Sequence, residues 1–359
     1  MPAAVAEIGS QFQVDGTFAS CERYTGGHIN ETYFAAYDCG GLVRRYVHQR
    51  INTHVFRDAH ALIQNVGSVT RHIRAKLHER GEPDLERRVL RVIPTHAGED
   101  MLVRGGEYWR TYAFVERTAT RVRVETRADA YAAARAFGEF AALLADLPVA
   151  QLEETIPGFH DTPGRVRALE TAIAADSAGR ASQARDEILL AQHLRGLACA
   201  LGHLARRECL PLRATHNDTK ITNVLFDSIT GEAVCVVDLD TVMPGLTLYD
   251  AGEMIRTACT RAHEDEPDPQ NVVIDGELLQ AVVSGFSEGA GALLTPAERT
   301  SLVLAGRVLA YENGVRFLTD YLSGDTYFRV HHPQQNLDRA RAQLTLARKL
   351  EAFEGACAI

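Results

Sequence analysis

The chain of 359 residues lacks several features that mark well-defined classes of protein. Its seven cysteines are odd in number and scattered, and none forms a CxxC pair, so a secreted disulfide framework is not indicated. No uncharged apolar run reaches the roughly 18 residues that a membrane helix needs. The first residues lack the basic and apolar regions of a signal peptide. We therefore expect a cytoplasmic protein with reduced thiols and no membrane partner.

Positive charge is also scarce in this sequence. There are 38 lysines and arginines against 47 aspartates and glutamates, which gives a formal net charge of −9. A nucleic-acid surface needs a basic face, so we expect no nucleic-acid partner. The P-loop pattern GxxxxGK[ST] is absent, which removes the commonest nucleotide-binding motif. Trp109 is the single tryptophan, so an aromatic cage for a quaternary ammonium is poorly supplied.

The composition that is present is ordinary for a globular protein, with 46% hydrophobic and 24% charged residues. The first third is rich in strand signals. Residues 33–37 and 42–50 read as strands joined by a turn at Asp38-Cys39-Gly40-Gly41. Further predicted elements are a weaker strand at 17–24, a helix at 58–79, and strands at 88–94 and 108–115 that flank Gly105-Gly106.

After residue 116 the pattern becomes mainly helical. The predicted helices are 128–147, one that begins at Pro163 behind the cap Asp161, 182–207, 277–288, 296–322 and 336–353. Two short strands, 223–226 and 233–237, interrupt them. The sequence therefore predicts an α+β protein with a small β-rich region at 1–116 and a large, mainly helical region at 117–359.

Polar residues at fixed spacing lie in the helix-poor interval between 214 and 240. Asp218 follows His216 by two residues and precedes Asn223 by five, and Asp238 ends the apolar run 234–237. Phosphoryl transfer needs a carboxylate that accepts the proton of the attacking hydroxyl, and oxygen ligands for Mg²⁺. The spacing favours Asp218 as the base and Asn223 and Asp238 as metal ligands.

Two other residues of this interval have assigned roles. Lys220 is the predicted phosphate contact, and His216 is expected to order the loop rather than to titrate. In the alternative interpretation Asp218 and Asn223 are turn residues and Asp238 is a strand-end cap.

The segment His216-Asn217-Asp218-Thr219-Lys220-Ile221-Thr222-Asn223 resembles the catalytic loop of the protein-kinase-like superfamily. Together with Val237-Asp238-Leu239-Asp240, it is similar to the aminoglycoside phosphotransferase/choline kinase branch. The resemblance implies a bilobal fold that uses ATP and Mg²⁺. It implies an N-lobe at 1–116, with a five-stranded sheet and a helix that bind nucleotide, and a C-lobe at 117–359 with the catalytic loop, metal site and sugar pocket.

On the nucleotide side the resemblance assigns Gly26 and Gly27 to the turn over the phosphates and Phe114-Val115-Glu116 to the hinge. A Gly-Gly turn between strands is also common for structural reasons alone. The superfamily usually carries its ATP-contacting lysine on the strand at 45–50, but this chain has Gln49 and Arg50 there. We therefore expect Gln49 in the nucleotide site and leave the phosphate-contacting cation open.

The acceptor side resembles the N-acetylhexosamine 1-kinases, through segments such as 159–163, 238–245 and 316–328. That resemblance implies phosphorylation of the C1 hydroxyl of N-acetylglucosamine or N-acetylgalactosamine. The implied sugar-binding residues are His28, Asn30, Asp218, Arg316 and Tyr327.

Other interpretations of these residues are open. Arg316 could be a buried arginine paired with Asp320 or Glu312, and Tyr327 could belong to the core. Other functions are open as well: a kinase of another hydroxyl, such as an amino alcohol, an inositol or an aminoglycoside, or a nucleotide-binding pseudokinase. No feature of the sequence requires an oligomer, so we expect a monomer.

Overall fold

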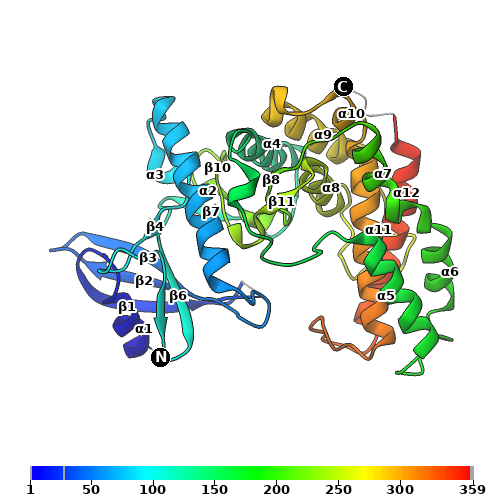
Figure 1. Cartoon of the computed structure of the whole chain (residues 1–359), viewed down its shortest axis with the longest axis horizontal. Helices are drawn as coiled ribbons and strands as arrows, with labels where there is room; N and C mark the ends of the chain where they lie inside the picture. Colours follow the sequence, from blue (N-terminus) through cyan, green and yellow to red (C-terminus); the bar gives the residue numbers. More distant parts are fainter. Residues whose placement is uncertain (1, 27–28, 356–359) are drawn as a thin grey trace. The chain divides into compact units, whose positions relative to one another are not determined.

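A computed structural model describes residues 2–26 and 29–355, which divide into two compact units (Figure 1). Unit 1 comprises the chain up to Ala119 together with Asp146–Pro157 and Leu225–Pro244. Unit 2 comprises Thr120–Ala145, Gly158–Val224 and the chain from Gly245 onward. With 48% helix and 16% strand, the predicted α+β class is confirmed.

Unit 1 is built on a six-stranded antiparallel sheet. Its order is β1-β2-β3-β6-β4, and β5 pairs with β6. The strands are β1 Thr17–Tyr24, β2 Glu31–Asp38, β3 Val43–Arg50, β4 Val92–Ile93, β5 Leu102–Arg104 and β6 Glu107–Ala113. The sheet has one strand more than the five expected, because the turn at Gly105-Gly106 closes a short hairpin of β5 and β6. Both glycines have positive φ, of 59° and 80°, which favours glycine.

One face of this sheet carries the core of unit 1. Tyr33, Ala35 and Tyr37 alternate along β2 and are all buried, as expected for a strand with one covered face. They pack with Val5 and Ile8 of α1 (Pro2–Gly9). Trp109 belongs to the same core and is only 6% exposed, so the single tryptophan is unavailable for an aromatic cage.

The strand predicted at 88–94 is largely wrong. The structure places a helical turn, α3 (Leu85–Arg88), before the two-residue strand β4. The turn buries Arg87, whose Nε donates to the Glu116 carbonyl at 3.0 Å and whose Nη2 donates to Asp227 Oδ2 at 2.6 Å. An extended strand would present alternate side chains to opposite faces, whereas these bonds hold the backbone in a turn.

The helix α2 (Ala59–Glu79) was predicted almost to the residue. Asp58 caps it by accepting a hydrogen bond from the Ala61 N–H at 2.9 Å. The second sheet, in order β10-β9-β7, consists of β7 Thr118–Thr120, β9 Val224–Asp227 and β10 Ala233–Val236. The hairpin of β9 and β10 was also predicted, and it leads into the short 3₁₀ helix η4 (Leu239–Thr241).

Unit 2 is a set of helices around the buried helix α11. Figure 1 shows α11 and α12 side by side, and α5 and α8 also pack on α11. Most side chains of α11 are buried, including the polar residues Arg307, Glu312 and Asp320, so the helix is covered around most of its circumference. The helices are α4 Arg127–Leu143, α5 Thr162–Ala175, α6 Arg185–His193, α7 Ala200–Arg207, α8 Thr247–Ala258, α9 Gly276–Ala290, α10 Pro296–Thr300, α11 Leu302–Leu322 and α12 Gln335–Lys349.

Two predicted helices are interrupted. The helix predicted at 182–207 divides into α6, the 3₁₀ turn η2 (Arg195–Cys199) and α7, with Gly196, a poor helix former, at the break. The helix predicted at 296–322 divides at Ser301 into α10 and α11. Asp161 caps α5 as predicted, accepting from the Gly164 N–H at 2.9 Å. Within the described residues no single helix has the length and apolar composition to cross a membrane, although the bent pair Arg185–His193 and Arg195–Arg207 passes on those two criteria.

Candidate active site

The loop that carries Asp218 is attached to α8 by one buried carboxylate, that of Asp250 in unit 2. Its two oxygens accept from the backbone N–H groups of His216 and Asn217, at 2.9 and 2.7 Å. The Asp250 carbonyl accepts from the Thr219 hydroxyl at 2.5 Å. All four residues are buried, so each of these bonds is shielded from competing water. The loop conformation is therefore fixed from both sides of Asp218.

Asn217 lies in the left-handed region of backbone space, with φ of 66°. This conformation costs free energy for a residue with a side chain, although asparagine tolerates it better than most. Asn217 compensates through its amide, which donates to the Thr215 carbonyl at 3.1 Å and accepts from the Thr215 hydroxyl at 3.0 Å. A strained residue held this firmly is typical of a functional loop.

The carboxylate of Asp218 is half-buried and faces two polar neighbours. Lys220 Nζ lies 2.9 Å from its Oδ2, and Asn223 Nδ2 donates to the same oxygen at 3.1 Å and to the Asp218 carbonyl at 2.8 Å. Burial opposes the charge of Asp218, but Lys220, His216 and the Asn223 amide together outweigh it and hold the pKa of that carboxyl below its usual range. Asp218 is therefore ionised at neutral pH, as a proton acceptor must be.

His216 is completely buried and packs between two aromatic side chains of α4. Its ring centroid lies 5.3 Å from that of Phe137 and 5.7 Å from that of Phe140, both in edge-on arrangements. Its Nδ1 accepts from the Asp218 backbone N–H at 3.3 Å. These contacts suit a residue that orders the loop.

The second predicted metal ligand, Asp238, lies in unit 1 at the end of β10. Its side chain is exposed and its φ is 62°, again in the left-handed region. Two residues later Asp240 is buried, and its Oδ1 lies 2.6 Å from Arg110 Nη1. Asp240 Oδ2 accepts from Asn30 Nδ2 at 2.6 Å. The turn after β10 is therefore tied by Asp240 to β6 and to the segment before β2.

The oxygen chemistry of the two predicted ligands fits Mg²⁺. Asn223 uses its amide nitrogen toward Asp218, which leaves the amide oxygen as the group suited to a hard cation, and Asp238 offers an exposed carboxylate. No group of three or more histidine, cysteine, aspartate or glutamate side chains in the described residues could hold a metal ion alone. Mg²⁺ commonly binds one or two protein oxygens together with water and substrate phosphates, so each of these two groups is chemically suited to be a ligand.

The predicted nucleotide-binding residues that the structure describes all lie in unit 1. Gly26 is in an exposed bend, and Gly27 lies outside the described residues. Gln49 points from β3 toward its neighbours: its Nε2 donates to the Thr32 hydroxyl at 2.9 Å, and its Oε1 accepts from Arg110 Nε at 3.0 Å. Arg110 had no predicted role.

The predicted hinge, Phe114-Val115-Glu116, borders an aromatic and charged surface of unit 1. The Arg45 guanidinium lies 4.0 Å above the Phe114 ring and pairs with the Glu116 carboxylate. The Phe34 ring meets Phe114 edge-on at 5.5 Å. Phe114 and Glu116 also line a small hollow of about 340 Å³, together with Val43, Arg44, Arg45, Tyr46 and Arg91. Val115 is buried, and its carbonyl accepts from the Thr118 hydroxyl at 2.8 Å.

The predicted sugar-binding residues that the structure describes are divided between the two units. Asn30 is in unit 1 and already bonds Asp240, and His28 lies outside the described residues. In unit 2, Arg316 donates to Asn313 Oδ1 at 3.2 Å, and its guanidinium lies 5.3 Å from the centre of the Phe328 ring. Tyr327 is 72% exposed.

The core interpretation of Tyr327 is therefore wrong, as is the pairing of Arg316 with Asp320. Asp320 instead accepts from the backbone N–H groups of Thr326, Tyr327 and Phe328, at 2.9, 2.8 and 2.9 Å. Glu312 accepts from His160 and from the Thr162 hydroxyl, at 2.9 and 2.6 Å. The turn that carries Tyr327 is thus held rigidly while its ring faces solvent.

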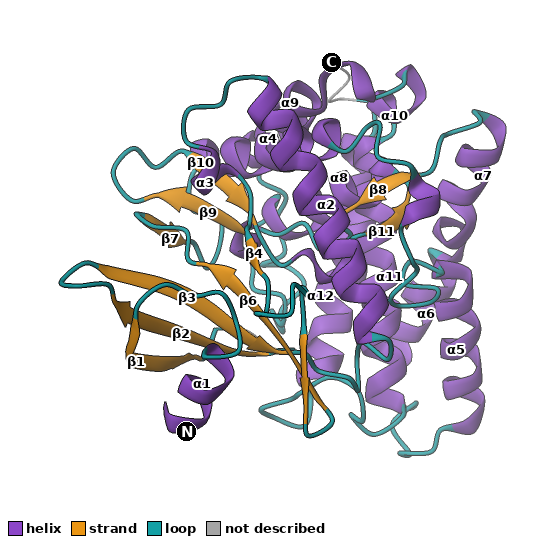
Figure 2. Ribbon diagram, turned by 60° about the vertical axis from the view of Figure 1, so that its left-hand side comes forward, coloured by secondary structure: helices purple, strands orange, loops and turns teal. Residues whose placement is uncertain are grey.

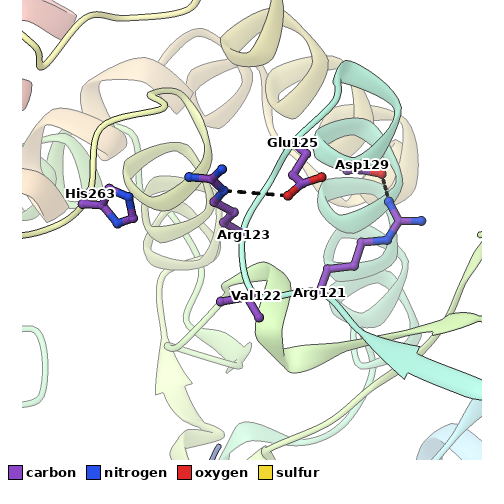
Figure 3. A pocket seen from close by; sticks show the side chains of 6 residues that line it. All are labelled: Arg121, Val122, Arg123, Glu125, Asp129 and His263. Carbon is purple, nitrogen blue, oxygen red and sulfur yellow. Dashed lines mark ion pairs between the residues drawn. The ribbon is translucent and has the colours of Figure 1, made fainter.

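A larger hollow of about 520 Å³ lies elsewhere in unit 2 (Figure 3). It is lined by Arg121, Val122, Arg123, Glu125, Asp129 and His263. Figure 3 shows Arg121 directed to Asp129 and Arg123 to Glu125, with His263 on the opposite side. None of the predicted site residues lines this hollow. The volume of a hollow alone therefore does not identify the active site of this protein.

Solved structures resemble the chain over nearly its whole length. An aminoglycoside phosphotransferase from Alicyclobacillus acidocaldarius is 15% identical with a TM-score of 0.62, and the match covers 99% of this chain and 95% of that one. A microcompartment-associated aminopropanol kinase is 14% identical with a TM-score of 0.56, covering 99% and 98%. A choline/ethanolamine kinase family protein from Mesorhizobium loti is 18% identical with a TM-score of 0.51, covering 94% and 88%.

At these identities the likeness concerns the fold, and it confirms the predicted kinase-like architecture. The family model described as the phosphotransferase enzyme family matches residues 20–281. That range covers more than half of the chain and includes the catalytic loop around Asp218 and the turn at Asp238. The chain therefore belongs to the phosphotransferase enzyme family.

Proposed function

We propose that this small-molecule phosphotransferase is an ATP-dependent kinase of the anomeric C1 hydroxyl of N-acetylhexosamines. The observation that carries the proposal is the catalytic loop, in which Asp218 is held ionised beside Lys220 and Asn223. The acceptor assignment rests on the resemblance of segments such as 316–328 to N-acetylhexosamine 1-kinases.

In the proposed reaction Asp218 accepts the proton of the C1 hydroxyl as that oxygen bonds to the γ-phosphorus. The bond between that phosphorus and the oxygen of ADP breaks, so the products are ADP and a sugar 1-phosphate. An anomeric hydroxyl is more acidic than an ordinary alcohol, so an ionised carboxylate of modest basicity suffices. Bound by Asn223 and Asp238, Mg²⁺ would neutralise charge on the β- and γ-phosphates.

The acceptor assignment is supported by the surroundings of Tyr327. A sugar presents hydroxyl groups together with an apolar ring face, and an exposed aromatic ring on a rigid turn suits that face. Arg316, on the adjoining helix α11, supplies hydrogen-bond donors. A quaternary ammonium acceptor is less well supported, because such a group binds in an aromatic cage and the single tryptophan is buried in the core of unit 1.

The test is ADP release with Mg·ATP against N-acetylgalactosamine, N-acetylglucosamine, galactose, glucose, choline and kanamycin, with the product position assigned by phosphorus NMR. A 1-phosphate of an acetylated sugar is the expected product. Turnover of choline or kanamycin alone would favour the kinase of another hydroxyl. ADP binding without turnover of any acceptor would favour a pseudokinase.

Asp218→Asn should remove turnover, a fall of at least about 100-fold, because the amide cannot take the proton. The Kd for ADP should stay close to that of the wild type. As a matched test of the acceptor side, Tyr327→Ala should raise the KM for the sugar, whereas Tyr327→Phe, which keeps the ring, should not. Wild-type turnover by Asp218→Asn would show that another group is the base.

A further inference from the structure

Arg110 of β6 is a buried cation in unit 1. The residue is only 1% exposed, and its counterion Asp240 is 3% exposed, with Nη1 and Oδ1 2.6 Å apart. Burying an ion pair costs several kcal/mol of desolvation per ion, so such pairs are poor sources of stability. The Arg110–Asp240 pair lies beside the turn expected to bind the metal ion, which points to a role in function rather than in stability.

The position of Arg110 in the sheet is informative. The register of β3 and β6 pairs Gln49 with Arg110, so the two side chains project from the same face. They are joined by the bond from Arg110 Nε to Gln49 Oε1 at 3.0 Å (β3 and β6 in Figure 2). Gln49 occupies the strand on which the kinase-like proteins usually carry their ATP-contacting lysine. The lysine expected on β3 is replaced by Gln49, and the cation that Gln49 contacts is Arg110 on the neighbouring strand.

Arg110 also reaches the segments expected to receive the nucleotide. Its partner Asp240 bonds Asn30, whose Oδ1 accepts from the Asn52 N–H at 3.0 Å. Asp240 lies two residues after Asp238, within the turn whose first residue has a left-handed backbone. The guanidinium thus links β3, the segment before β2 and the metal-binding turn.

The charge state of this group is secure. Burial opposes the charge of Arg110, but the carboxylate of Asp240, then Tyr112 and, more weakly, the carboxylate of Asp238 raise its pKa above the ordinary value for arginine. The cation is therefore permanent, and its field includes the predicted metal ligand Asp238.

We propose that Arg110 takes the place of the strand lysine as a positioning residue. Its guanidinium bonds Gln49 through Nε and pairs with Asp240 through Nη1, and it thereby fixes Asp240, the Asp238 turn and Asn30 in the arrangement that binds the nucleotide with its metal ion. The inference rests on the proposed function, since it concerns the same nucleotide site. We expect no direct contact between Arg110 and the phosphates, because the Arg110 side chain is buried.

The alternative is an ion pair that only stabilises unit 1, and Arg256 of unit 2 supplies the matched control. Arg256 is also buried, and its Nη2 lies 2.5 Å from Oε1 of the buried Glu253. Lysine at either position keeps the charge but loses the fork, so Arg110→Lys and Arg256→Lys should lose similar amounts of thermal stability. Only Arg110→Lys should affect nucleotide binding.

The experiment measures the Kd for ADP by calorimetry, with and without Mg²⁺, well below each variant's Tm. Arg110→Lys and Asp240→Asn should weaken Mg·ADP binding by about tenfold or more, as expected when a group behind a metal ligand is lost. ADP binding without Mg²⁺ should change less. Arg256→Lys should bind Mg·ADP as the wild type does.

A second variant covers the case in which Arg110→Lys folds poorly. Gln49→Lys combined with Arg110→Met moves the cation back to β3, and it should bind Mg·ADP more tightly than Arg110→Met alone. Arg110→Lys with a Kd within twofold of the wild type, at a Tm loss like that of Arg256→Lys, would overturn the inference. Wild-type protein that binds Mg·ADP but phosphorylates no acceptor would overturn the proposed function alone, and absence of Mg·ADP binding would overturn both.

Discussion

At the scale of single residues, the catalytic loop depends on the buried carboxylate of Asp250. Asp250→Ala would leave the N–H groups of His216 and Asn217 without their acceptor. Each buried unsatisfied group costs about 1–3 kcal/mol, so the loss of acceptor for two groups should lower the free energy of unfolding by about 2–6 kcal/mol. A displaced Asp218 should lower kcat by about 100-fold, because misplacement by an ångström has effects of that size.

Asp275→Ala is the control for this variant, because Asp275 also accepts from two backbone N–H groups, those of Glu277 and Leu278. It caps α9, so its loss should cost about 1 kcal/mol and leave kcat unchanged. Chemical denaturation and steady-state kinetics measure both quantities. Wild-type kcat in Asp250→Ala would mean that the loop keeps its shape without this carboxylate.

His48 is a buried residue whose effect should depend on pH. Burial lowers the pKa of His48 to about 4, and the ring bonds Tyr37 and Thr111 at 2.9 and 2.8 Å. The unfolded chain, with a histidine pKa near 6.5, binds more protons between about pH 4 and 6.5. The stability contributed by the neutral ring is therefore present above pH 6.5 and is lost as the pH falls, by about 2 kcal/mol at pH 5.

His48→Gln removes this titration while keeping an amide that can bond both neighbours. Urea unfolding at pH 7 and pH 5 should show a smaller loss of stability in the variant than in the wild type. The value of the variant at pH 7 gives the packing cost of the substitution. An equal loss in both proteins would show that His48 is not the group that titrates.

At the scale of elements, helices α4 and α9 approach each other through glycine. A Cβ on Gly289 would lie 2.2 Å from the Arg135 carbonyl oxygen, and one on Gly285 would lie 2.4 Å from that of Tyr131. Backbone cannot yield as a side chain can, so Gly289→Ala should destabilise the protein by about 1–3 kcal/mol. Since α4 also packs on His216, a shift of α4 should lower kcat as well.

Gly202→Ala, in α7, is the matched control. Its Cβ would meet only Arg206 Nη1, at 3.6 Å, so alanine should be neutral or stabilise the helix by about 0.5–1 kcal/mol. Thermal melting and kcat of the two variants decide the question. If Gly289→Ala matched Gly202→Ala in both, the close approach of α4 and α9 would not be needed for the site.

Elements were predictable where local signals agree. Strand β1, helix α2 and the hairpin of β9 and β10 appear close to their predicted bounds, because alternation, caps and turn residues act over a few positions. The break at Gly196 and the turn that buries Arg87 were not predicted. The glycine contacts between α4 and α9 are set by tertiary packing, which local patterns do not encode.

In the candidate site, too, the residues close together in the sequence were predicted and the pair far apart was not. His216, Asp218 and Asn223 lie within eight residues of one another, so their spacing alone suggested the loop. The pair of Arg110 and Asp240 joins residues 130 positions apart, and alternation along β6 does not distinguish a buried arginine from an exposed one. The only signal was indirect: the strand at Gln49 lacks the expected lysine.

At the scale of the whole molecule, the chain leaves unit 1 at Ala119 and returns to it twice. The segment Asp146–Pro157 supplies Glu153, whose carbonyl accepts from Asn65 at 2.8 Å. The segment Leu225–Pro244 supplies Asp227 and Asp240, the counterions of two buried arginines. The sequence predicted a nucleotide-binding domain that ends at residue 116. Whether residues up to this boundary fold alone stays a prediction, which a truncated chain can test.

A fragment that ends at Ala119 should not fold cooperatively. It keeps Arg87 and Arg110 but lacks Asp227 and Asp240, and removal of one partner of a buried pair costs about 3–5 kcal/mol. Two such losses amount to about 6–10 kcal/mol, which is comparable with the 5–15 kcal/mol by which domains are stable. Circular dichroism should show a broad, non-cooperative melt, and the same fragment with Arg87→Met and Arg110→Met should regain structure if unpaired charge is the cause. A sharp transition in the unmodified fragment would show instead that the first 119 residues form a domain whose stability does not depend on the returning segments.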